Sequence, residues 1–585
     1  MRVADAFYQL QMGAPEAAEK TCLSLLKRER GNVEATLLMA QIYGQSGRVA
    51  DCLTMLTRAQ RLRSQDPTIA YNLGVALNMA QRHEEAAAAY RRVLALAPTH
   101  IDARTNLAAC LMCLGLPEKA SCELKLLRSV DPTSRTIFLN YLSALLESGD
   151  CIAALAEIEA APKALGGDPQ AKLLLGRALN GARRHQEAAV LFEELLTRAP
   201  PSVDVLNGWG VALLGLGETK QALDRLREAV MRDPTLAEAH HNLGHALHRS
   251  GLFDEALQSY DRARELASFV PALAYNKSML LLALGQFEDG WANFESRKLL
   301  GSQALGVNLT QIRDLQNIAQ AKGASVLIDW EQGLGDTIQF CRFARSLADI
   351  GAKVTLRVQP CMQTVLRSLD KRVKVTSGDI DPRDHKLHVQ LMSLPGLFQT
   401  NEDNIPFRDG YVSVDAARVD EWRARIGTQG FRIGIAWQGN KQAKVDLGRS
   451  FSLECFRPLA GIPGVRRISL QKNEGSEEVT QFGAELGLET LGPGFDAGDQ
   501  AFLDSAAVMQ SLDLVITSDT ALAHLAGATG RPVWVALQHV PDWRWMLDRA
   551  ESPWYSSMRL FRQGTPGDWA GVFEAMSACL AQERR

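Results

Sequence analysis

A short polar segment near the C-terminus has the residue types of a phosphate-binding turn. Ser518, Asp519 and Thr520 follow the apolar run 512–517, which predicts a buried strand, and precede a small-residue run that predicts a helix. Free backbone N–H groups and the helix dipole at such a helix N-terminus favour a phosphate. His524 lies four residues after Thr520, so both side chains share one helix face and can reach that phosphate. Equally, Ser518 or Asp519 can merely cap the helix while His524 packs.

Asp336 lies at a second strand-to-helix turn. It ends the sequence Gly333-Leu334-Gly335-Asp336, which follows a predicted strand at 324–330, and the glycines permit a tight turn. A carboxylate in that place can accept a proton as a general base. It can also cap the helix, because Gln339 lies three residues further on, as in a capping box. The two roles are compatible, since a capping aspartate is held in a fixed position.

Positive charge gathers in the loop that follows the predicted strand 432–437. Lys441, Lys444 and Arg449 lie in this loop, and together they can neutralise a diphosphate without a metal ion. The alternative is an ordinary solvated loop that binds no ligand.

The elements that position these residues are of the α/β type. Apolar runs alternate with helical segments and predict parallel strands at 324–330, 353–358, 432–437, 465–471, 512–517 and 533–537. Ligands bind at the carboxyl ends of such strands, where the polar turns lie. The strands fall into two series that divide near residue 427, which predicts two lobes with a cleft suited to a nucleotide-linked substrate.

The first half of the chain repeats every 34 residues. One position of the unit is small or compact in every unit but one, where it is Leu142, and a small residue recurs twelve positions later. Aromatic residues fill the position four further on in several units, and glycines separate the two helices of most units. The compact residues are Ala40, Gly74, Ala108, Gly176, Gly210, Gly244 and Ser278; the aromatic residues are Tyr90, Phe192, Tyr260 and Phe294; and the turn glycines are Gly47, Gly115, Gly149, Gly217, Gly251 and Gly285.

This pattern resembles the tetratricopeptide repeat over roughly residues 1–300. The resemblance implies a superhelix of helical hairpins whose concave face binds a peptide or protein. Asparagine recurs at one equivalent position and resembles the asparagine ladder with which the repeats of O-linked N-acetylglucosamine transferase hold an extended polypeptide. We therefore expect partner contacts at Asn72, Asn106, Asn140, Asn242 and Asn276.

Composition narrows the classes of function. The 585 residues carry a net charge of −3, with 46% hydrophobic and 22% charged residues, which excludes a broad basic surface for nucleic acid and indicates a globular protein. No apolar run has the length of a transmembrane segment, and the first residues predict an amphipathic helix instead of a signal sequence. Scattered cysteines fit a reducing compartment, so we expect a cytoplasmic protein.

Two groups of metal-ligand residue types lie in predicted helices. Cys110 and Cys113 form a C-x-x-C with no second pair, and His241, His245 and His248 share one helix face. Packing is the favoured interpretation of both groups, with partner contact as a further option for the histidines. We predict no metal site.

Three motifs of the second half resemble those of the heptosyltransferase-like glycosyltransferases: Gly333-Leu334-Gly335-Asp336, Trp437-Gln438-Gly439-Asn440 and Asp519-Thr520-Ala521-Leu522-Ala523-His524-Leu525. The segments Pro541-Asp542-Trp543-Arg544-Trp545 and Ser552-Pro553-Trp554-Tyr555 look like the bacterial branch in which this domain follows tetratricopeptide repeats. The resemblance covers about residues 322–575. It implies a GT-B fold of two Rossmann-like lobes, a nucleotide-sugar donor, metal-independent inverting transfer and no cofactor.

The same resemblance implies roles for single residues. Asp336 matches the catalytic aspartate, and Trp543 and Trp545 either line the cleft or pack in the core. Two departures from the family pattern are Ala521, where heptosyltransferases usually have glycine, and the loop 443–446, which lacks a histidine often present in relatives with repeats. The expected donor-binding residues are Gly335, Asn440, Lys444, Arg449, Ser518, Asp519, Thr520 and His524.

We therefore predict a multi-domain chain. It comprises a tetratricopeptide-repeat superhelix at 1–299, a linker at 300–322, an acceptor-side GT-B lobe at 323–427 and a nucleotide-sugar lobe at 428–585. The predicted function is transfer of a sugar from a nucleotide sugar to an acceptor that the repeats select. The alternatives are a non-catalytic interaction scaffold and a sugar-nucleotide sensor, each with a degenerate GT-B domain.

Overall fold

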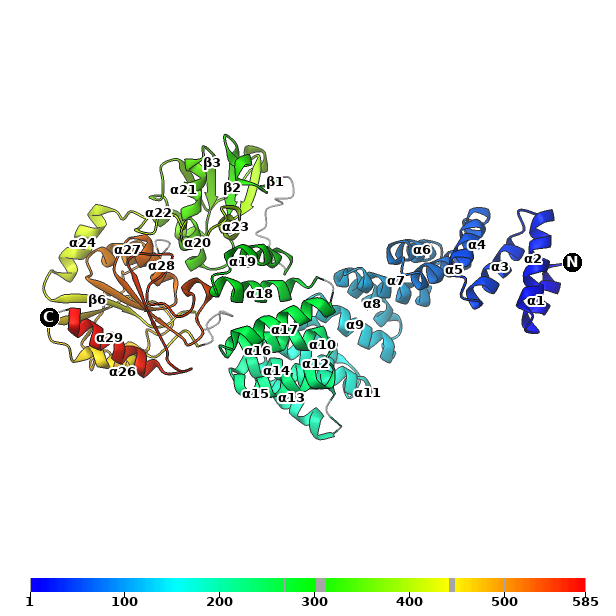
Figure 1. Ribbon diagram of the computed structural model, residues 1–585, viewed down its shortest axis with the longest axis horizontal. Coiled ribbons are helices and arrows are strands. Elements are labelled where there is room, and N and C mark those ends of the chain that lie inside the picture. Colours follow the sequence, from blue (N-terminus) through cyan, green and yellow to red (C-terminus); the bar gives the residue numbers. More distant parts are fainter. Residues whose placement is uncertain are drawn as a thin grey trace. The chain divides into compact units, whose positions relative to one another are not determined.

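The computed structural model describes residues 2–198, 200, 202–267, 269–300, 312–440, 448–498 and 501–583. The chain divides into two compact units, Met1–Arg232 and Asp233–Arg585. The first unit is helical, and the second contains helices followed by two parallel sheets (Figure 1). None of the described helices combines the length and the apolar character needed to cross a membrane.

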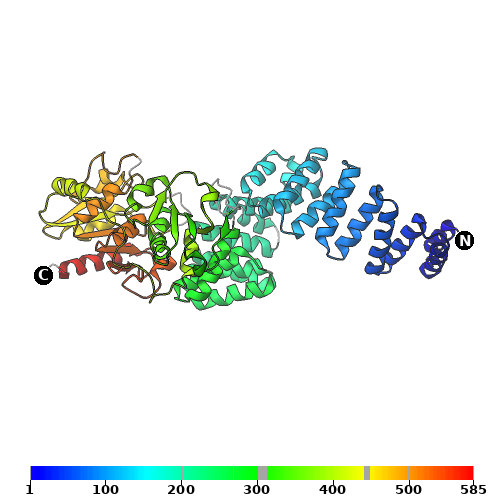
Figure 2. The ribbon, with the colours of Figure 1, turned by 90° about the horizontal axis from the view of Figure 1, so that it is seen from above.

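The helices of the first unit pair as successive hairpins, which lie side by side in Figure 2. Several begin at a residue whose side chain accepts a backbone N–H: Asn32 accepts from Ala35 at 2.9 Å, and Asp66 accepts from Thr68 at 2.9 Å. The helices are α1 (Val3–Gln11), α2 (Pro15–Arg28), α3 (Val33–Gln45), α4 (Val49–Leu62), α5 (Pro67–Met79), α6 (His83–Leu96), α7 (Ile101–Cys113), α8 (Pro117–Val130), α9 (Arg135–Glu147), α10 (Cys151–Ala160), α11 (Lys163–Gly166), α12 (Pro169–Gly181), α13 (His185–Arg198), α14 (Val203–Leu216) and α15 (Thr219–Arg232).

Glycines and aromatic rings pack together inside the hairpins, as the 34-residue pattern predicts. A Cβ atom added to Gly74 would lie 2.7 Å from the Tyr90 ring, and one added to Gly244 would lie 2.8 Å from the Tyr260 ring. Both tyrosine side chains are fully buried. The ring of the second helix therefore fills the space that a side chain on the first helix would need.

The turn between the two helices of a hairpin takes the left-handed conformation. The predicted turn glycines have φ between 68° and 83°. Gln81, at φ 58°, and Arg183, at φ 62°, hold the same position in two other hairpins. The backbone of the repeat is therefore kept at these two positions, although a residue with a Cβ atom costs about 1 kcal/mol more than glycine there.

The second unit begins with two further hairpins: α16 (Ala237–Arg249) with α17 (Phe253–Leu266), and α18 (Pro271–Ala283) with α19 (Phe287–Phe294), which η1 (Glu295–Leu299) follows. The last hairpin shares its hydrophobic core with the α/β region. The Trp291 indole donates to the Thr400 carbonyl at 2.8 Å, and its ring meets the Trp543 ring edge-on at 5.3 Å. The helices predicted to belong to the repeat superhelix therefore end inside the core of the next fold.

The first sheet is parallel, with the strand order β1-β5-β2-β3-β4. Its strands are β1 (Arg313–Asp314), β2 (Ser325–Asp329), β3 (Lys353–Arg357), β4 (Val373–Thr376) and β5 (Leu387–Gln390). Its helices and helical turns are η3 (Ile318–Ala321), α20 (Leu334–Phe340), α21 (Arg342–Asp349), η4 (Pro360–Met362), α22 (Gln363–Leu366), η5 (Pro382–Asp384), η6 (Leu391–Ser393) and α23 (Leu394–Leu397). The stretch predicted as a linker, 300–322, supplies the edge strand β1, a strand too short for an apolar pattern to reveal.

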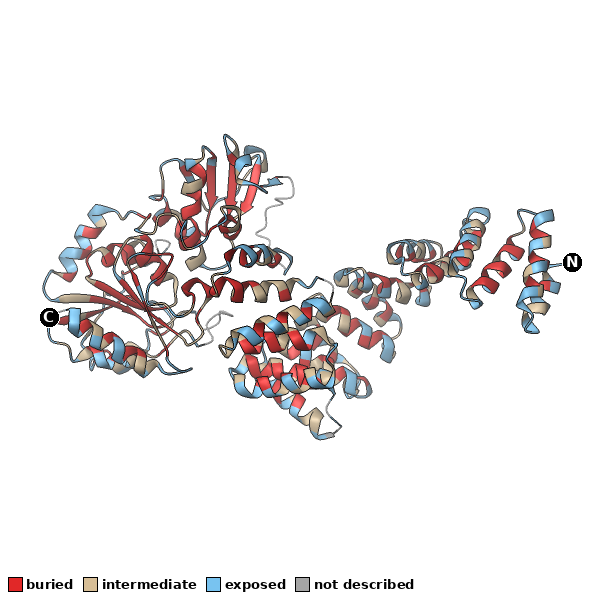
Figure 3. Cartoon of the chain, in the orientation of Figure 1, coloured by how far each residue is buried: buried red, intermediate tan, exposed pale blue. Residues whose placement is uncertain are grey.

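The second sheet is also parallel, with the order β11-β10-β9-β6-β7-β8. Its strands are β6 (Phe431–Ala436), β7 (Val465–Ser469), β8 (Leu488–Glu489), β9 (Leu514–Ser518), β10 (Val533–Leu537) and β11 (Met558–Arg562). The accompanying helices are α24 (Ala416–Ile426), η7 (Leu453–Phe456), α25 (Arg457–Ala460), α26 (Glu478–Phe482), α27 (Leu503–Gln510), α28 (Ala521–Ala528), η8 (Trp543–Trp545) and α29 (Trp569–Glu583). Buried residues dominate the strands of both sheets (Figure 3).

In each sheet the strands that follow an inner strand in the sequence lie on both sides of it. In the first sheet β3 and β4 lie on one side of β2, and β5 lies on the other. In the second sheet β7 and β8 lie on one side of β6, and β9, β10 and β11 lie on the other. Open parallel sheets bind ligands at such switch points, where the loops from two neighbouring strands diverge. Asp336 lies in the first turn of the helix that follows β2, and Asp519 lies in the loop after β9.

The shared core predicts that a change in α19 destabilises the α/β region. Trp291→Phe keeps an aromatic ring but leaves the buried Thr400 carbonyl without its donor, which costs about 1–3 kcal/mol. Urea unfolding of the second unit, followed by circular dichroism, measures the loss. Trp209→Phe, at a partly buried position of the first unit, is the control and leaves that transition unchanged. Equal effects of the two variants would contradict a shared core.

Candidate functional site

Asp336 lies in the first turn of α20, directly beyond the carboxyl end of β2. One carboxylate oxygen accepts the Gly333 N–H at 2.8 Å, and the other forms an ion pair with Arg544. The predicted capping pair of Asp336 and Gln339 is therefore wrong, because Asp336 itself is the residue that closes the helix end at Gly333. The tight turn is made by Gln332, at φ 61°, and not by a glycine.

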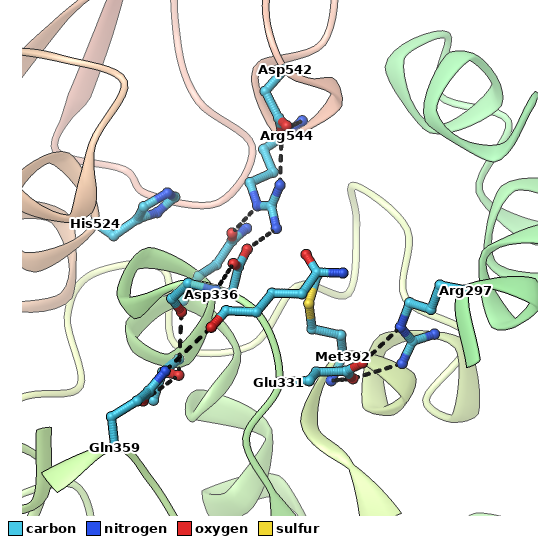
Figure 4. Close-up of polar contacts among 12 residues, drawn as sticks. Arg297, Glu331, Asp336, Gln359, Met392, His524, Asp542 and Arg544 are labelled. Atoms are coloured by element: carbon cyan, nitrogen blue, oxygen red, sulfur yellow. Dashed lines mark hydrogen bonds and ion pairs between the residues drawn. The ribbon is translucent and has the colours of Figure 1, made fainter. Parts of the chain in front are cut away.

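Arg544, from η8 after β10, connects the two sheet-containing regions. Its Nε atom donates to Gln339 Oε1 at 2.6 Å, and its Nη1 atom donates to Asp542 Oδ1 at 2.9 Å. Its Nη2 atom donates to Asp336 (Figure 4). The guanidinium also lies 4.6 Å from the centre of the Trp543 ring. With 9% of its side chain exposed, Arg544 is fixed by partners on both sides.

The charges around Asp336 act in opposite directions. Burial raises the pKa of Asp336, and the neighbouring carboxylates Asp542 and Glu331 add to this effect, while Arg544 and the Gly333 N–H lower it. The net pKa lies above the usual value of 3.8. A carboxylate with a raised pKa is a stronger proton acceptor, which suits a general base.

The turn after β9 presents an open helix N-terminus. Thr520 is the N-cap residue of α28, and its side chain makes no capping hydrogen bond; its hydroxyl lies 3.3 Å from the Thr517 hydroxyl. Ser518 was expected in the turn but is the last residue of β9, where its Oγ atom is buried without a hydrogen-bond partner. Burial raises the pKa of Asp519 to about 6, and the positive charges of Arg449 and Arg544 partly oppose the shift.

His524 is held by packing on the inner side of α28. Its Nδ1 atom lies 3.1 Å from the Tyr555 hydroxyl, and its ring stacks on Trp545 at 5.3 Å. Burial lowers the pKa of His524 well below its usual value, and Arg544, Arg342 and Arg449 lower it further. The imidazole is therefore neutral at physiological pH and adds no positive charge to the site.

Helices α20 and α28 meet where glycine replaces a side chain. A Cβ atom added to Gly335 would lie 2.9 Å from the His524 ring and 3.6 Å from the Ala521 Cα atom. Gly335 thus brings the N-termini of the two helices together, and with them Asp336 and the turn at Asp519. This contact places the first and third predicted motifs at one site.

The loop after β6 approaches the same place. The Gly439 N–H donates to Ser450 Oγ at 3.1 Å, so the two ends of the loop meet beside the sheet. Asn440 is exposed at the start of the loop, and half-buried Arg449 at its end acts electrostatically on Asp519 and His524. Lys441 and Lys444 lie outside the described residues.

The asparagines of the repeats differ in their environments. Asn72 and Asn140 are exposed, and Asn242 is half-buried. Asn106 donates to the Tyr71 hydroxyl at 3.3 Å, and Asn276 lies 2.9 Å from His241 Nε2; each of these partners belongs to the preceding hairpin. Asn106 and Asn276 therefore link neighbouring hairpins, which leaves fewer of their hydrogen-bonding groups for a partner.

The candidate metal ligands named from the sequence are two cysteines and three histidines of the repeats. Within the part of the chain that the structure describes, no three His, Cys, Asp or Glu side chains lie close enough to hold a metal ion. Cys110 is buried and Cys113 is exposed. Burial lowers the pKa of His241 to about 4, of His245 to about 3 and of His248 to about 4, so the three rings form an uncharged surface on α16.

Sequence reasoning gave no role to Arg544, Asp542 or Tyr555. Arg544 and Asp336 are 208 residues apart, and no local pattern joins them. The available signal was an aspartate, Asp542, followed by an arginine between two tryptophans, in the loop after the predicted strand 533–537. Charged residues in such an apolar loop have to find partners inside the protein.

Comparisons with known protein families support the tetratricopeptide repeats predicted from the sequence. Models of the tetratricopeptide repeat match residues 37–101, 77–138, 142–203 and 207–271. These helices are tetratricopeptide repeats. A tetratricopeptide-repeat protein from Parabacteroides merdae is 14% identical, with a TM-score of 0.39 over 43% of this chain and 98% of that one. The MamA structure is 21% identical, with a TM-score of 0.24 over 31% and 96%.

The related proteins differ in how much of this chain they match. Protein FlbA of Caulobacter vibrioides is 28% identical over 435 residues, which covers 69% of this chain and 72% of that protein. Because the tetratricopeptide repeats occupy about half of the chain, this similarity includes part of the α/β region. Cellulose synthase operon protein C of Pseudomonas fluorescens is 30% identical over 189 residues, and tetratricopeptide repeat protein 7A of Homo sapiens is 34% identical over 91 residues. The chain matches only 14% and 11% of their lengths.

The raised pKa of Asp519 predicts a pH-dependent stability. The folded protein binds this proton more tightly than the unfolded chain does, so the contribution of Asp519 to stability is lost as the pH rises through about 6. Asp519→Asn should therefore stabilise the second unit at pH 7.5 by about 1–3 kcal/mol, with no gain near pH 4. Melting temperatures at the two pH values measure the difference. Asp420→Asn, at an exposed position of α24, should show no such dependence.

Proposed function

We propose that this chain is a glycosyltransferase that moves a sugar from a nucleotide-sugar donor to an acceptor selected by the tetratricopeptide repeats. The supporting observation is the meeting of α20 and α28 at Gly335, which brings Asp336 to the turn at Asp519. Each of these residues follows a strand at the switch point of its sheet. The two sheets would then be the Rossmann-like lobes of a GT-B fold.

In this proposal Asp336 acts as the general base. It takes the proton of an acceptor hydroxyl, and the hydroxyl oxygen forms a bond to the anomeric carbon of the donor sugar. The bond from that carbon to the phosphate oxygen breaks at the same time, and its electron pair leaves with the nucleotide diphosphate. Attack opposite the leaving group inverts the anomeric centre. Neither a metal ion nor a cofactor is required.

The N-terminus of α28 supports a diphosphate site. Its backbone N–H groups have no side-chain cap from Thr520, and a phosphate oxygen can replace that cap. Arg449 and Arg544 both act electrostatically on Asp519 in this turn and can balance the developing negative charge. Lys444 would add a further charge from its loop, outside the described residues.

The tetratricopeptide repeats supply the surface for a protein or peptide acceptor. In the first unit a groove of about 790 Å³ is lined by α1, α3, α4 and α5. Its wall is largely apolar, with Glu34, Gln41, Gln45 and Asn72 as charged or polar groups. An extended polypeptide fits this mixture, because asparagine and glutamine side chains can pair with its backbone while apolar residues contact its side chains.

A sugar-nucleotide sensor or scaffold is the second candidate. It is favoured by the partners that the expected catalytic groups already have: Asp336 is paired with Arg544, and His524 lies against Tyr555 and Trp545. Such a protein would bind a nucleotide sugar and transfer nothing. A thermal-shift screen with nucleotide sugars, followed by a transfer assay with each ligand that binds, separates the two candidates.

Donor binding should depend on the turn after β9. Thr520→Ala removes the hydroxyl at the N-terminus of α28 and should weaken binding of the nucleotide sugar found in the screen by about tenfold. Thr529→Ala removes a threonine hydroxyl at the other end of the same helix, where it donates to the Leu525 carbonyl at 2.9 Å. Thr529→Ala is therefore the matched control, and calorimetry measures the donor affinity of both variants. Unchanged affinity in folded Thr520→Ala protein would place the phosphate elsewhere.

Transfer should depend on the carboxylate of Asp336. Asp336→Asn keeps an oxygen that accepts the Gly333 N–H but removes the proton acceptor. Turnover should fall by about two to four orders of magnitude. Single-turnover transfer rates test this. A rate within a few-fold of wild type would show that another group takes the proton.

A further inference from the structure

Arg544 is shared between the two halves of the proposed site. Its guanidinium has five N–H groups. Of these, one donates to Gln339, one to Asp542 and one to Asp336. The Trp543 ring covers one face of the guanidinium plane. The planar group is therefore held in place, and it still has donors to offer a further anion.

The proposed diphosphate site is close to this guanidinium. Its partner Asp336 follows Gly335, and Gly335 packs against Ala521 and His524 in the first half of α28. The charge of Arg544 also acts on Asp519 and His524. A diphosphate at the helix N-terminus would therefore lie within the field of Arg544. Phosphate oxygens accept bidentate hydrogen bonds from arginine, and two phosphates carry more charge than one carboxylate. The diphosphate can compete with Asp336 for the Nη2 atom.

We propose that Arg544 couples donor binding to the base, which rests on the function proposed above. In the ligand-free protein Arg544 holds Asp336. When a donor binds, its diphosphate takes the guanidinium, and Asp336 is released to accept the proton of the acceptor hydroxyl. Asp542 and Gln339 keep the arginine in reach of both partners. Arg544 thus binds the leaving group and positions the base, and the base becomes free only when a donor is present.

The surroundings of Asp336 make this exchange measurable. The charged and titratable groups that act on it are Asp542 from η8, Glu331 from the loop after β2 and Tyr275 from α18, besides Arg544 itself. Glu331 is bound to Arg297 at 2.7 Å and to the Met392 N–H at 2.9 Å, so it stays in place (Figure 4). When Arg544 turns to the donor, Asp336 is left among acidic and neutral groups. Its proton affinity then rises.

The test is calorimetry on the full chain with UDP-glucose, UDP-N-acetylglucosamine, GDP-mannose and ADP-glucose. These diphosphate diesters have no phosphate group that titrates near pH 6. Titrations at pH 6 in two buffers with different ionisation enthalpies give the number of protons taken up on binding. The wild type should take up a fraction of a proton. Asp336→Asn should take up fewer protons than the wild type, the remainder coming from Asp519, which titrates at a pKa of about 6 in the donor turn. It should also bind the donor about three- to tenfold more tightly, because Asp336 no longer competes for Arg544.

Substitution of the arginine completes the test. Arg544→Gln should weaken donor binding by more than about tenfold and lower proton uptake to the level of Asp336→Asn. Arg559→Gln, a half-exposed arginine of β11, is the matched control and should change neither quantity. If a donor binds but Asp336→Asn shows wild-type affinity and wild-type proton uptake, the coupling is wrong while the proposed function stands. If none of the donors binds the wild type, both fall.

Discussion

The site depends on one buried cation. Arg342, in the first turn of α21, is fully buried, and it donates to the Gln339 carbonyl at 2.8 Å and to the Trp554 carbonyl at 2.9 Å. It also donates to the Tyr411 hydroxyl at 3.0 Å. A buried guanidinium has to satisfy its donors, and these acceptors come from distant parts of the chain. By collecting them, Arg342 fixes α20 against the segment that carries Tyr555, and Asp336 reaches Arg544.

Periodic features of the fold could be predicted from the sequence. The 34-residue unit was visible because each hairpin repeats the same close contact, such as Gly74 against Tyr90. The strands β2, β3, β6, β7, β9 and β10 were visible because strands buried on both faces form continuous apolar runs. The edge strands β1 and β8 are two residues long and carry no such signal. The helix expected after the strand 324–330 is divided at Cys341, between α20 and α21.

Motif positions could be predicted, but not the contacts between them. The sequence located the turns at Asp336 and Asp519, because polar residues after apolar runs mark the ends of strands. It could not show that these turns meet, since strand order is set by tertiary packing. Nor could it identify Arg544 as the partner of Asp336, or show that the His524 ring is hydrogen-bonded to the Tyr555 hydroxyl. Partners far apart in the chain leave no trace in local spacing.

The last hairpin of the repeats has a consequence for how such a chain can change its length. Most repeat arrays can gain or lose units at either end, because each unit contacts only its neighbours. Here Trp291 of α19 is bonded to Thr400 and lies against Trp543, beside Arg544. Units can therefore be added or deleted upstream of α18 without disturbing this contact, whereas the C-terminal unit is fixed. Recognition can diversify at one end while the neighbourhood of Asp336 stays constant.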